Sequence, residues 1–144
     1  MARLLLDTNA LIWFNAGAPL EGEAVFEIAT AQRDGTLFVS PISAWEAALA
    51  LRKANPARRP DLSGDDAATW FRRVRQTSGA RLATIGARIA LEAARVPDVY
   101  GIGDPGDCFI IATARVNDLI VVTRDGPMSD LARARPEYLR LIQC

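Results

Sequence analysis

Short apolar segments that are typical of buried strands alternate along this chain with longer segments of helical pattern. The first, Leu4-Leu5-Leu6, has no polar residue in it, which is expected of a parallel strand covered on both faces. Strands are predicted at Arg3 to Asp7, Thr36 to Val39, Arg81 to Ile85, Leu119 to Thr123 and Tyr138 to Ile142. This alternation predicts a single α/β domain over residues 1–144, with a mainly parallel central sheet of about four or five strands flanked by helices.

The segments between the strands predict helices, and two of these begin with a capping residue followed by proline. Helices are expected at Thr8 to Phe14, Leu20 to Arg33, Ser40 to about Lys53, Asp65 to Gln76, Ala87 to Arg95, Asp104 to about Asn117 and Met128 to Arg133. Prolines and glycines predict connections at Asn55 to Gly64 and Val96 to Gly103. The tryptophans have aliphatic neighbours, so we predict core positions for Trp13, Trp45 and Trp70.

The chain contains no histidine and only two cysteines, Cys108 and Cys144. This composition excludes a Ser-His-Asp triad, a His-ligated zinc ion and a Cys₄ site. Basic and acidic residues number 17 each, which argues against a protein that coats nucleic acid by bulk charge. The longest apolar runs have five residues, too few to span a membrane, and the N-terminus does not resemble a signal peptide. We therefore expect a cytoplasmic protein with no membrane partner.

Four acidic residues follow predicted strands or lie in the first turns of predicted helices: Asp7, Glu46, Asp107 and Asp125. The carboxyl ends of parallel strands lie along one edge of a sheet, so these side chains can converge there. A cluster of carboxylates without histidine or cysteine suits Mg²⁺ or Mn²⁺. Such an ion activates water and neutralises a phosphate oxygen, so these residues favour metal-assisted phosphoester hydrolysis.

Each acid also has a purely structural explanation. Asp7 can cap the helix that follows it, and Glu46 can be a solvated helical residue. Asp104 and Asp107 together make an ordinary helix start, and Asp125 belongs to a turn sequence. The ordered set, rather than any one member, therefore supports the chemical hypothesis.

Four segments in this order resemble the motifs of PIN-domain ribonucleases, and the size of the chain fits the VapC-type toxins of bacterial toxin–antitoxin pairs. The segments are Asp7-Thr8-Asn9, Val39 to Glu46, Asp104 to Ala114 and Val121 to Asp125. The resemblance implies a metal-dependent endoribonuclease that hydrolyses RNA with Mg²⁺ or Mn²⁺ and leaves a 5′-phosphate. It also implies a homodimer and a small VapB-type antitoxin that covers or distorts the acidic site.

The same resemblance implies roles for individual residues. The acids that would hold the metal are Asp7, Glu46 and Asp107, with Asp125 as a fourth catalytic member. The residues that would orient carboxylates or the scissile phosphate are Thr8, Asn9, Ser40 and Thr123. Asp104 shares the Asp-Pro-x-Asp pattern with Asp107 but precedes the helix, so it is placed with this second group. Cys108 departs from the family, whose members often have arginine there.

The balanced net charge conceals an uneven distribution. Residues 52–95 contain ten basic residues, nine of them arginines, and only four acidic ones. Arginine suits bidentate phosphate contacts, so this segment predicts a phosphate-binding flank beside the acidic site. The alternatives are an ordinary solvated helix surface and a groove for a partner.

Other functions are also compatible with the sequence. A PIN nuclease with a housekeeping role in RNA processing would have no antitoxin, and a non-catalytic α/β scaffold would bind a partner without cleaving RNA. A receiver-like module is disfavoured because it needs an acidic pair at the first strand and a late lysine, whereas the only lysine here is Lys53.

Overall fold

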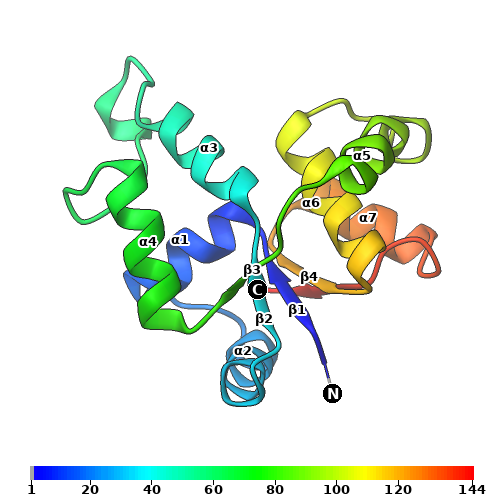
Figure 1. The fold of residues 1–144 in the computed structure, drawn as a ribbon, viewed down its shortest axis with the longest axis horizontal. Helices are drawn as coiled ribbons and strands as arrows, with labels where there is room; N and C mark the ends of the chain where they lie inside the picture. Colours follow the sequence, from blue (N-terminus) through cyan, green and yellow to red (C-terminus); the bar gives the residue numbers. More distant parts are fainter. Residues whose placement is uncertain (1) are drawn as a thin grey trace.

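Five parallel strands form one sheet in the order β3-β2-β1-β4-β5 in the computed structural model, which describes residues 2–144 (Figure 1). The strands are β1 (Leu4–Leu6), β2 (Leu37–Val39), β3 (Arg81–Leu82), β4 (Ile120–Thr123) and β5 (Leu141–Gln143). Leu5 of β1 pairs with Phe38 of β2 on one side and with Val121 of β4 on the other. The predicted α/β class with a parallel central sheet is confirmed.

Helices cover both faces of this sheet. They are α1 (Thr8–Ala16), α2 (Gly22–Asp34), α3 (Pro41–Ala50), α4 (Ala67–Ser78), α5 (Ala87–Tyr100), α6 (Pro105–Asn117) and α7 (Gly126–Ala134). Leu4 and Leu6 belong to a core that includes residues of α1 to α4, whereas Leu5 belongs to a core built with α5, α6 and α7. Successive side chains of a strand point to opposite faces, so the unbroken Leu4–Leu6 run reflects a strand that is buried on both. Figure 1 shows α1, α3 and α4 on one side of the strands and α5, α6 and α7 on the other.

The strand order creates a switch point at β1. The chain first moves outward from β1 to β2 and β3, and then returns to place β4 on the other side of β1. In open sheets of this kind, a crevice forms at the carboxyl ends of the strands where the direction reverses. Asp7 follows β1 and Asp125 lies just beyond β4, so both residues are at this crevice.

One predicted connection is wrong in its first half. Instead of ending near Arg95, α5 continues through Pro97 and ends with Tyr100. A proline inside a helix costs about 3 kcal/mol, but Val96 and Tyr100 are both buried in the core against α6. Burying two large side chains contributes roughly 3–6 kcal/mol, which is enough to carry the helix through the proline.

Two smaller predictions also need correction. Helix α3 ends at Ala50 rather than near Lys53, and the following loop contains a 3₁₀ turn, η1 (Pro56–Arg58). Trp70 is fully buried as predicted and Trp13 is partly buried, but Trp45 is 46% exposed. The buried positions of α3 are Ser43 and Ala47, and Trp45 points away from that face. Among residues 2–144, none of the helices has the length and apolarity needed to cross a lipid bilayer.

Candidate active site

Four acidic side chains from separate segments line one pocket at the carboxyl edge of the sheet. The pocket has a volume of about 360 Å³, and its acids are Asp7, Glu46, Asp107 and Asp125. Asn9 and Arg124 line it as well, and Asn9 is exposed to solvent. The structure thus brings together the four acids that the sequence singled out; below, they are called the acidic pocket.

Asp7 is held from two sides. It caps α1, where its Oδ1 accepts a hydrogen bond of 2.8 Å from the backbone N–H of Ala10. Its Oδ2 accepts a hydrogen bond from the hydroxyl of Thr123, at the end of β4. Burial raises the pKa of Asp7 above its ordinary value, while these two hydrogen bonds act in the opposite direction and Asp125 adds to the increase. Asp7 therefore caps a helix and lines the acidic pocket at once.

Thr123 connects two of the acids. It is fully buried, and while its hydroxyl donates to Asp7 it accepts the backbone N–H of Asp125 at 3.0 Å. Asp125 in turn caps α7 by accepting the N–H of Met128 at 2.8 Å. One hydroxyl thereby fixes Asp7 relative to Asp125.

Glu46 is positioned by α1 and α6. The Thr8 hydroxyl donates to Glu46 Oε1 at 2.5 Å, and it is also hydrogen-bonded to the Ser43 hydroxyl at 2.9 Å. Gly106 lies so close to the Glu46 carboxylate that a Cβ at position 106 would overlap it. Burial raises the pKa of Glu46, the Thr8 hydrogen bond lowers it, and the nearby charges of Asp104 and Asp7 raise it further.

Asp107 shares a tyrosine with Asp125. The Tyr100 hydroxyl lies 3.0 Å from Asp107 Oδ2 and 3.3 Å from Asp125 Oδ2. The pKa of Asp107 is raised to about 6, first by burial and then by the charges of Asp104, Asp125 and Glu46, although the Tyr100 hydrogen bond lowers it. Burial and the neighbouring carboxylates of Asp107 and Asp125 raise the pKa of Tyr100. Its hydroxyl therefore stays protonated and available as a donor.

Not every predicted residue reaches the carboxylates. The Ser40 hydroxyl accepts the N–H of Ile42 at 3.0 Å and caps α3, and within residues 2–144 it has no hydrogen bond to an acid. Asp104 is exposed and caps α6 by accepting the N–H of Asp107 at 3.0 Å. Ser40 and Asp104 therefore support the helices that carry Glu46 and Asp107.

Sequence reasoning missed three residues of the site: Tyr100, Ser43 and Gly106. Tyr100 lay in a segment predicted to be a connection, although its spacing of four from Val96 was compatible with a helical face. Ser43 belongs to the same motif as Ser40. Gly106 lies between the helix cap Asp104 and Asp107, and a glycine at such a position can indicate that another group approaches the backbone closely.

The donor set of the acidic pocket suits a hard divalent cation. All four candidate ligands are carboxylates, and oxygen ligands are those that Mg²⁺ and Mn²⁺ prefer. Within residues 2–144, no group of three or more acidic or cysteine side chains is already arranged to hold a metal ion. Mg²⁺ is usually held by one or two carboxylates and keeps several waters. An open ring of carboxylates around a pocket of this size therefore fits it.

The fold and the acidic pocket define an α/β protein with a cluster of carboxylates at the carboxyl edge of its parallel sheet. The PIN domain family matches residues 4–134, and the chain belongs to this family. Proteins of the family are generally hydrolytic nucleases. No curated protein sequence matches the chain.

Several solved structures share the fold at low sequence identity. A DNA-bound VapBC from Salmonella typhimurium has a TM-score of 0.65 and 17% identity, over 99% of this chain and 98% of that one. VapBC2 from Rickettsia felis, bound to a fragment of promoter DNA, has a TM-score of 0.63 and 13% identity over 98% of each chain. FitAcB from Neisseria gonorrhoeae has a TM-score of 0.57 and 21% identity over 96% of each chain.

Proposed function

We propose that this chain is a metal-dependent endoribonuclease and the toxin component of a toxin–antitoxin pair. The observation that supports the enzymatic part is the acidic pocket itself. Four carboxylates from four segments share one pocket, and Asp7, Glu46 and Asp107 each accept a hydrogen bond from a hydroxyl group of the chain.

In this proposal Asp7, Glu46 and Asp107 hold Mg²⁺ or Mn²⁺, and Asp125 completes the ring. When bound, the cation supplies charge for a phosphate oxygen and a water of lowered pKa. The hydroxyl groups of Thr123, Thr8 and Tyr100 fix the orientation of the carboxylates and favour their ionised forms. With a pKa of about 6, Asp107 is mostly ionised at neutral pH and is therefore in the form that binds a cation.

Among the residues that line the acidic pocket, Arg124 is the one with a basic side chain. Its guanidinium lies 4.1 Å from the ring centroid of Trp13 and donates to the backbone oxygens of Pro19 and Cys144. A guanidinium held in this way is preorganised to contact a phosphate oxygen of the substrate. We assign it the role of orienting the scissile phosphodiester.

The toxin part of the proposal is supported by the structural relatives, whose names describe VapBC and FitAB complexes, three of them bound to DNA. By analogy, we propose a small VapB-type antitoxin as a partner, a homodimer as the assembly, and action on RNA in the cytoplasm. A housekeeping nuclease with the same acidic pocket would have no such inhibitor, so expression of the chain alone separates the two roles. The toxin role is supported if expression of the chain arrests growth and co-expression of a candidate antitoxin relieves the arrest.

The test of the enzymatic function is cleavage of total cellular RNA by the purified protein with Mg²⁺ or Mn²⁺. Parallel reactions contain EDTA, or the Asp7→Asn and Asp107→Asn variants, with Asp130→Asn as a matched control because the Asp130 side chain is 75% exposed and lies outside the pocket. We expect discrete fragments with 5′-phosphates that disappear with EDTA and with either pocket variant. Cleavage that survives both pocket variants, when circular dichroism shows them to be folded, contradicts the proposed site.

A further inference from the structure

A second hollow adjoins the acidic pocket and runs outward between α1 and α3; we call it the α1–α3 groove. Its volume is about 640 Å³, and it shares Thr8, Asn9 and Glu46 with the acidic pocket. Its inner end lies beside the start of α6, and its outer end reaches Lys53 and Arg58. The groove is therefore continuous with the place where a scissile phosphate lies in the proposed function.

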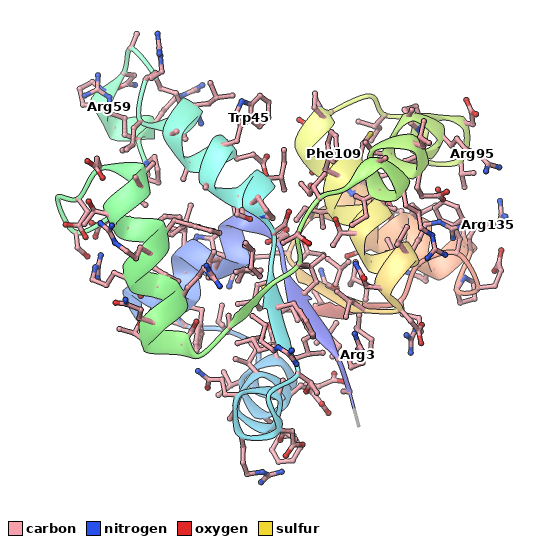
Figure 2. The ribbon with its side chains drawn as sticks, in the orientation of Figure 1. Arg3, Trp45, Arg59, Arg95, Phe109 and Arg135 are labelled. Carbon is pink, nitrogen blue, oxygen red and sulfur yellow. The ribbon has the colours of Figure 1, made fainter. Side chains whose placement is uncertain are left out.

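Two large apolar side chains line the groove without being covered by the rest of the chain. Trp45 and Leu49 are one helical turn apart on α3, and each is 46% exposed. Figure 2 shows Trp45 projecting outward from α3. Trp45 directly precedes Glu46, whose side chain lines both hollows. An exposed indole beside a catalytic acid is a stacking surface for an unpaired base.

The outer end of the groove carries a net positive charge. Arg52, Lys53, Arg58 and Arg59 follow the end of α3 and are exposed, and Figure 2 places Arg59 beyond that end of the helix. Across the part of the chain that the structure describes, none of the four forms an ion pair. One acid, Asp61, also lines this end. Unpaired, exposed cations of this kind are available to bind phosphates.

From this arrangement we propose that the α1–α3 groove binds single-stranded RNA next to the scissile bond, with one base stacked on Trp45 and phosphates bound by Lys53 and Arg58. The proposal rests on the proposed ribonuclease function and adds the path of the substrate to it. Glu46 and Ala50, the last residue of α3, are about 6 Å apart along the helix at roughly 1.5 Å per residue, and Lys53 follows three residues later, so a short single strand spans this part of the groove.

The order of chemical groups along the groove favours RNA over an apolar protein segment. Glu46 and the exposed Trp45 are neighbours on α3 at the inner end of the groove, and Lys53 and Arg58 lie at the outer end. This arrangement matches a phosphate and an unpaired base at the reaction site and further phosphates along one strand. An apolar segment of a protein would pair with Trp45 and Leu49 but would leave the cations without partners.

The test measures binding of a fluorescein-labelled octaribonucleotide of random sequence by fluorescence anisotropy, with EDTA present so that no cleavage occurs. Trp45→Leu keeps an apolar side chain but removes the aromatic face, and we expect it to weaken binding by about 5- to 150-fold. Trp45→Phe keeps an aromatic face and should retain most of the affinity. The double variant Lys53→Gln/Arg58→Gln should lower the slope of log K against log salt by about 1.4, because each phosphate contact to a single strand contributes about 0.7.

Matched controls are Phe26→Leu, at an aromatic side chain that is 67% exposed on α2, and Arg33→Gln/Arg133→Gln, at two exposed cations outside the groove. Both should bind the octamer like the unmodified protein. Unchanged affinity in Trp45→Leu, together with an unchanged salt slope in Lys53→Gln/Arg58→Gln, overturns the proposal and leaves the groove to a protein segment.

The binding test separates this proposal from the proposed function. If total RNA is not cleaved under any condition but Trp45→Leu still weakens binding of the octamer, the groove is correct and the enzymatic function is not. If total RNA is cleaved and the Trp45 and Lys53/Arg58 variants bind and cleave normally, the function is correct and the groove is not.

Discussion

Gly106 packs against the carboxylate of Glu46 so closely that no other residue fits at position 106 while Glu46 keeps its place. The backbone of Gly106 is helical and not left-handed, so conformational freedom is not the reason for glycine here. The absence of a side chain is what lets the start of α6 approach α3 and brings Glu46 into the acidic pocket.

We expect Gly106→Ala to impair catalysis and cation binding while leaving the fold intact. The added methyl group displaces the end of a flexible glutamate and breaks its hydrogen bond with Thr8, and alanine is the better helix former by roughly 1 kcal/mol. RNA cleavage should fall by at least about tenfold, as with other losses of a positioned ligand, with an unchanged or slightly higher midpoint of thermal unfolding. Gly22→Ala, at another helical glycine with open space around it, is the control. Normal cleavage by Gly106→Ala would show that Glu46 is not a ligand.

Tyr100→Phe should weaken the site without removing any carboxylate. The hydroxyl is the shared donor for Asp107 and Asp125, so its loss leaves two neighbouring negative charges without a common partner. We expect the apparent Kd for Mn²⁺, measured by isothermal titration calorimetry, to rise by about ten- to a hundredfold, with a parallel loss of cleavage. Tyr138→Phe, at a tyrosine that packs under Arg115, should change neither quantity. Equal Mn²⁺ affinity in Tyr100→Phe and the unmodified protein would limit Tyr100 to packing.

Asp107→Asn should stabilise the protein in EDTA at neutral pH, even though we expect it to abolish cleavage. The pKa of Asp107 is about 6 in the folded state and close to 3.9 in the unfolded chain. A raised pKa means that the folded state favours the protonated acid, so the stability it contributes is present below pH 4 and lost as the pH rises through 6. The gain for asparagine at pH 7 should be on the order of 1 kcal/mol, because solvent screens part of the effect.

Urea unfolding of both proteins between pH 4.5 and 7.5 measures this difference. The two stability curves should diverge as the pH rises and converge at the acidic end. A variant that is less stable than the unmodified protein at every pH would show that Asp107 is held by favourable contacts rather than strained by burial.

Thr123→Val should destabilise the fold and lower activity together. Valine keeps the shape of threonine but removes both the donor to Asp7 and the acceptor for the N–H of Asp125, and each is buried or partly buried. The free energy of unfolding should fall by about 1–3 kcal/mol, as measured by chemical denaturation. Thr113→Val is the matched control, because the buried Thr113 hydroxyl bonds only a helix carbonyl and its loss should cost less than about 1 kcal/mol. Equal losses in the two variants would contradict a special role for Thr123.

Local sequence patterns predicted the layers of the fold because each strand and each helix start depends on a few consecutive residues. An unbroken apolar run such as Leu4–Leu6 indicates a strand buried on both faces, and a capping residue before proline indicates a helix start at Ser40. The strand-end positions of Asp7 and Asp125 follow from the same reasoning. These features depend on neighbours in sequence, so no tertiary information was needed to place them.

Features that depend on which face of a helix is buried were not predictable in this way. Pro97 is a reliable sign of a helix end in isolation, and the burial of Val96 and Tyr100 against α6 overrides it. The aliphatic neighbours of Trp45 say nothing about the direction in which its ring points. Ser40 and Ser43 belong to one motif, but the first caps α3 whereas the second reaches Thr8 of another helix.

The hydrogen bond between Asp7 and Thr123 joins residues separated by 116 positions. During synthesis, Asp7 is made well before Thr123, whose hydroxyl arrives with β4 after three of the five strands are complete. A chain interrupted before β4 therefore has Glu46 and Asp107 but lacks Asp125 and one of the two groups that hold Asp7. The ring of acids is completed only after β4 has been made, so a product truncated before β4 does not carry a finished site.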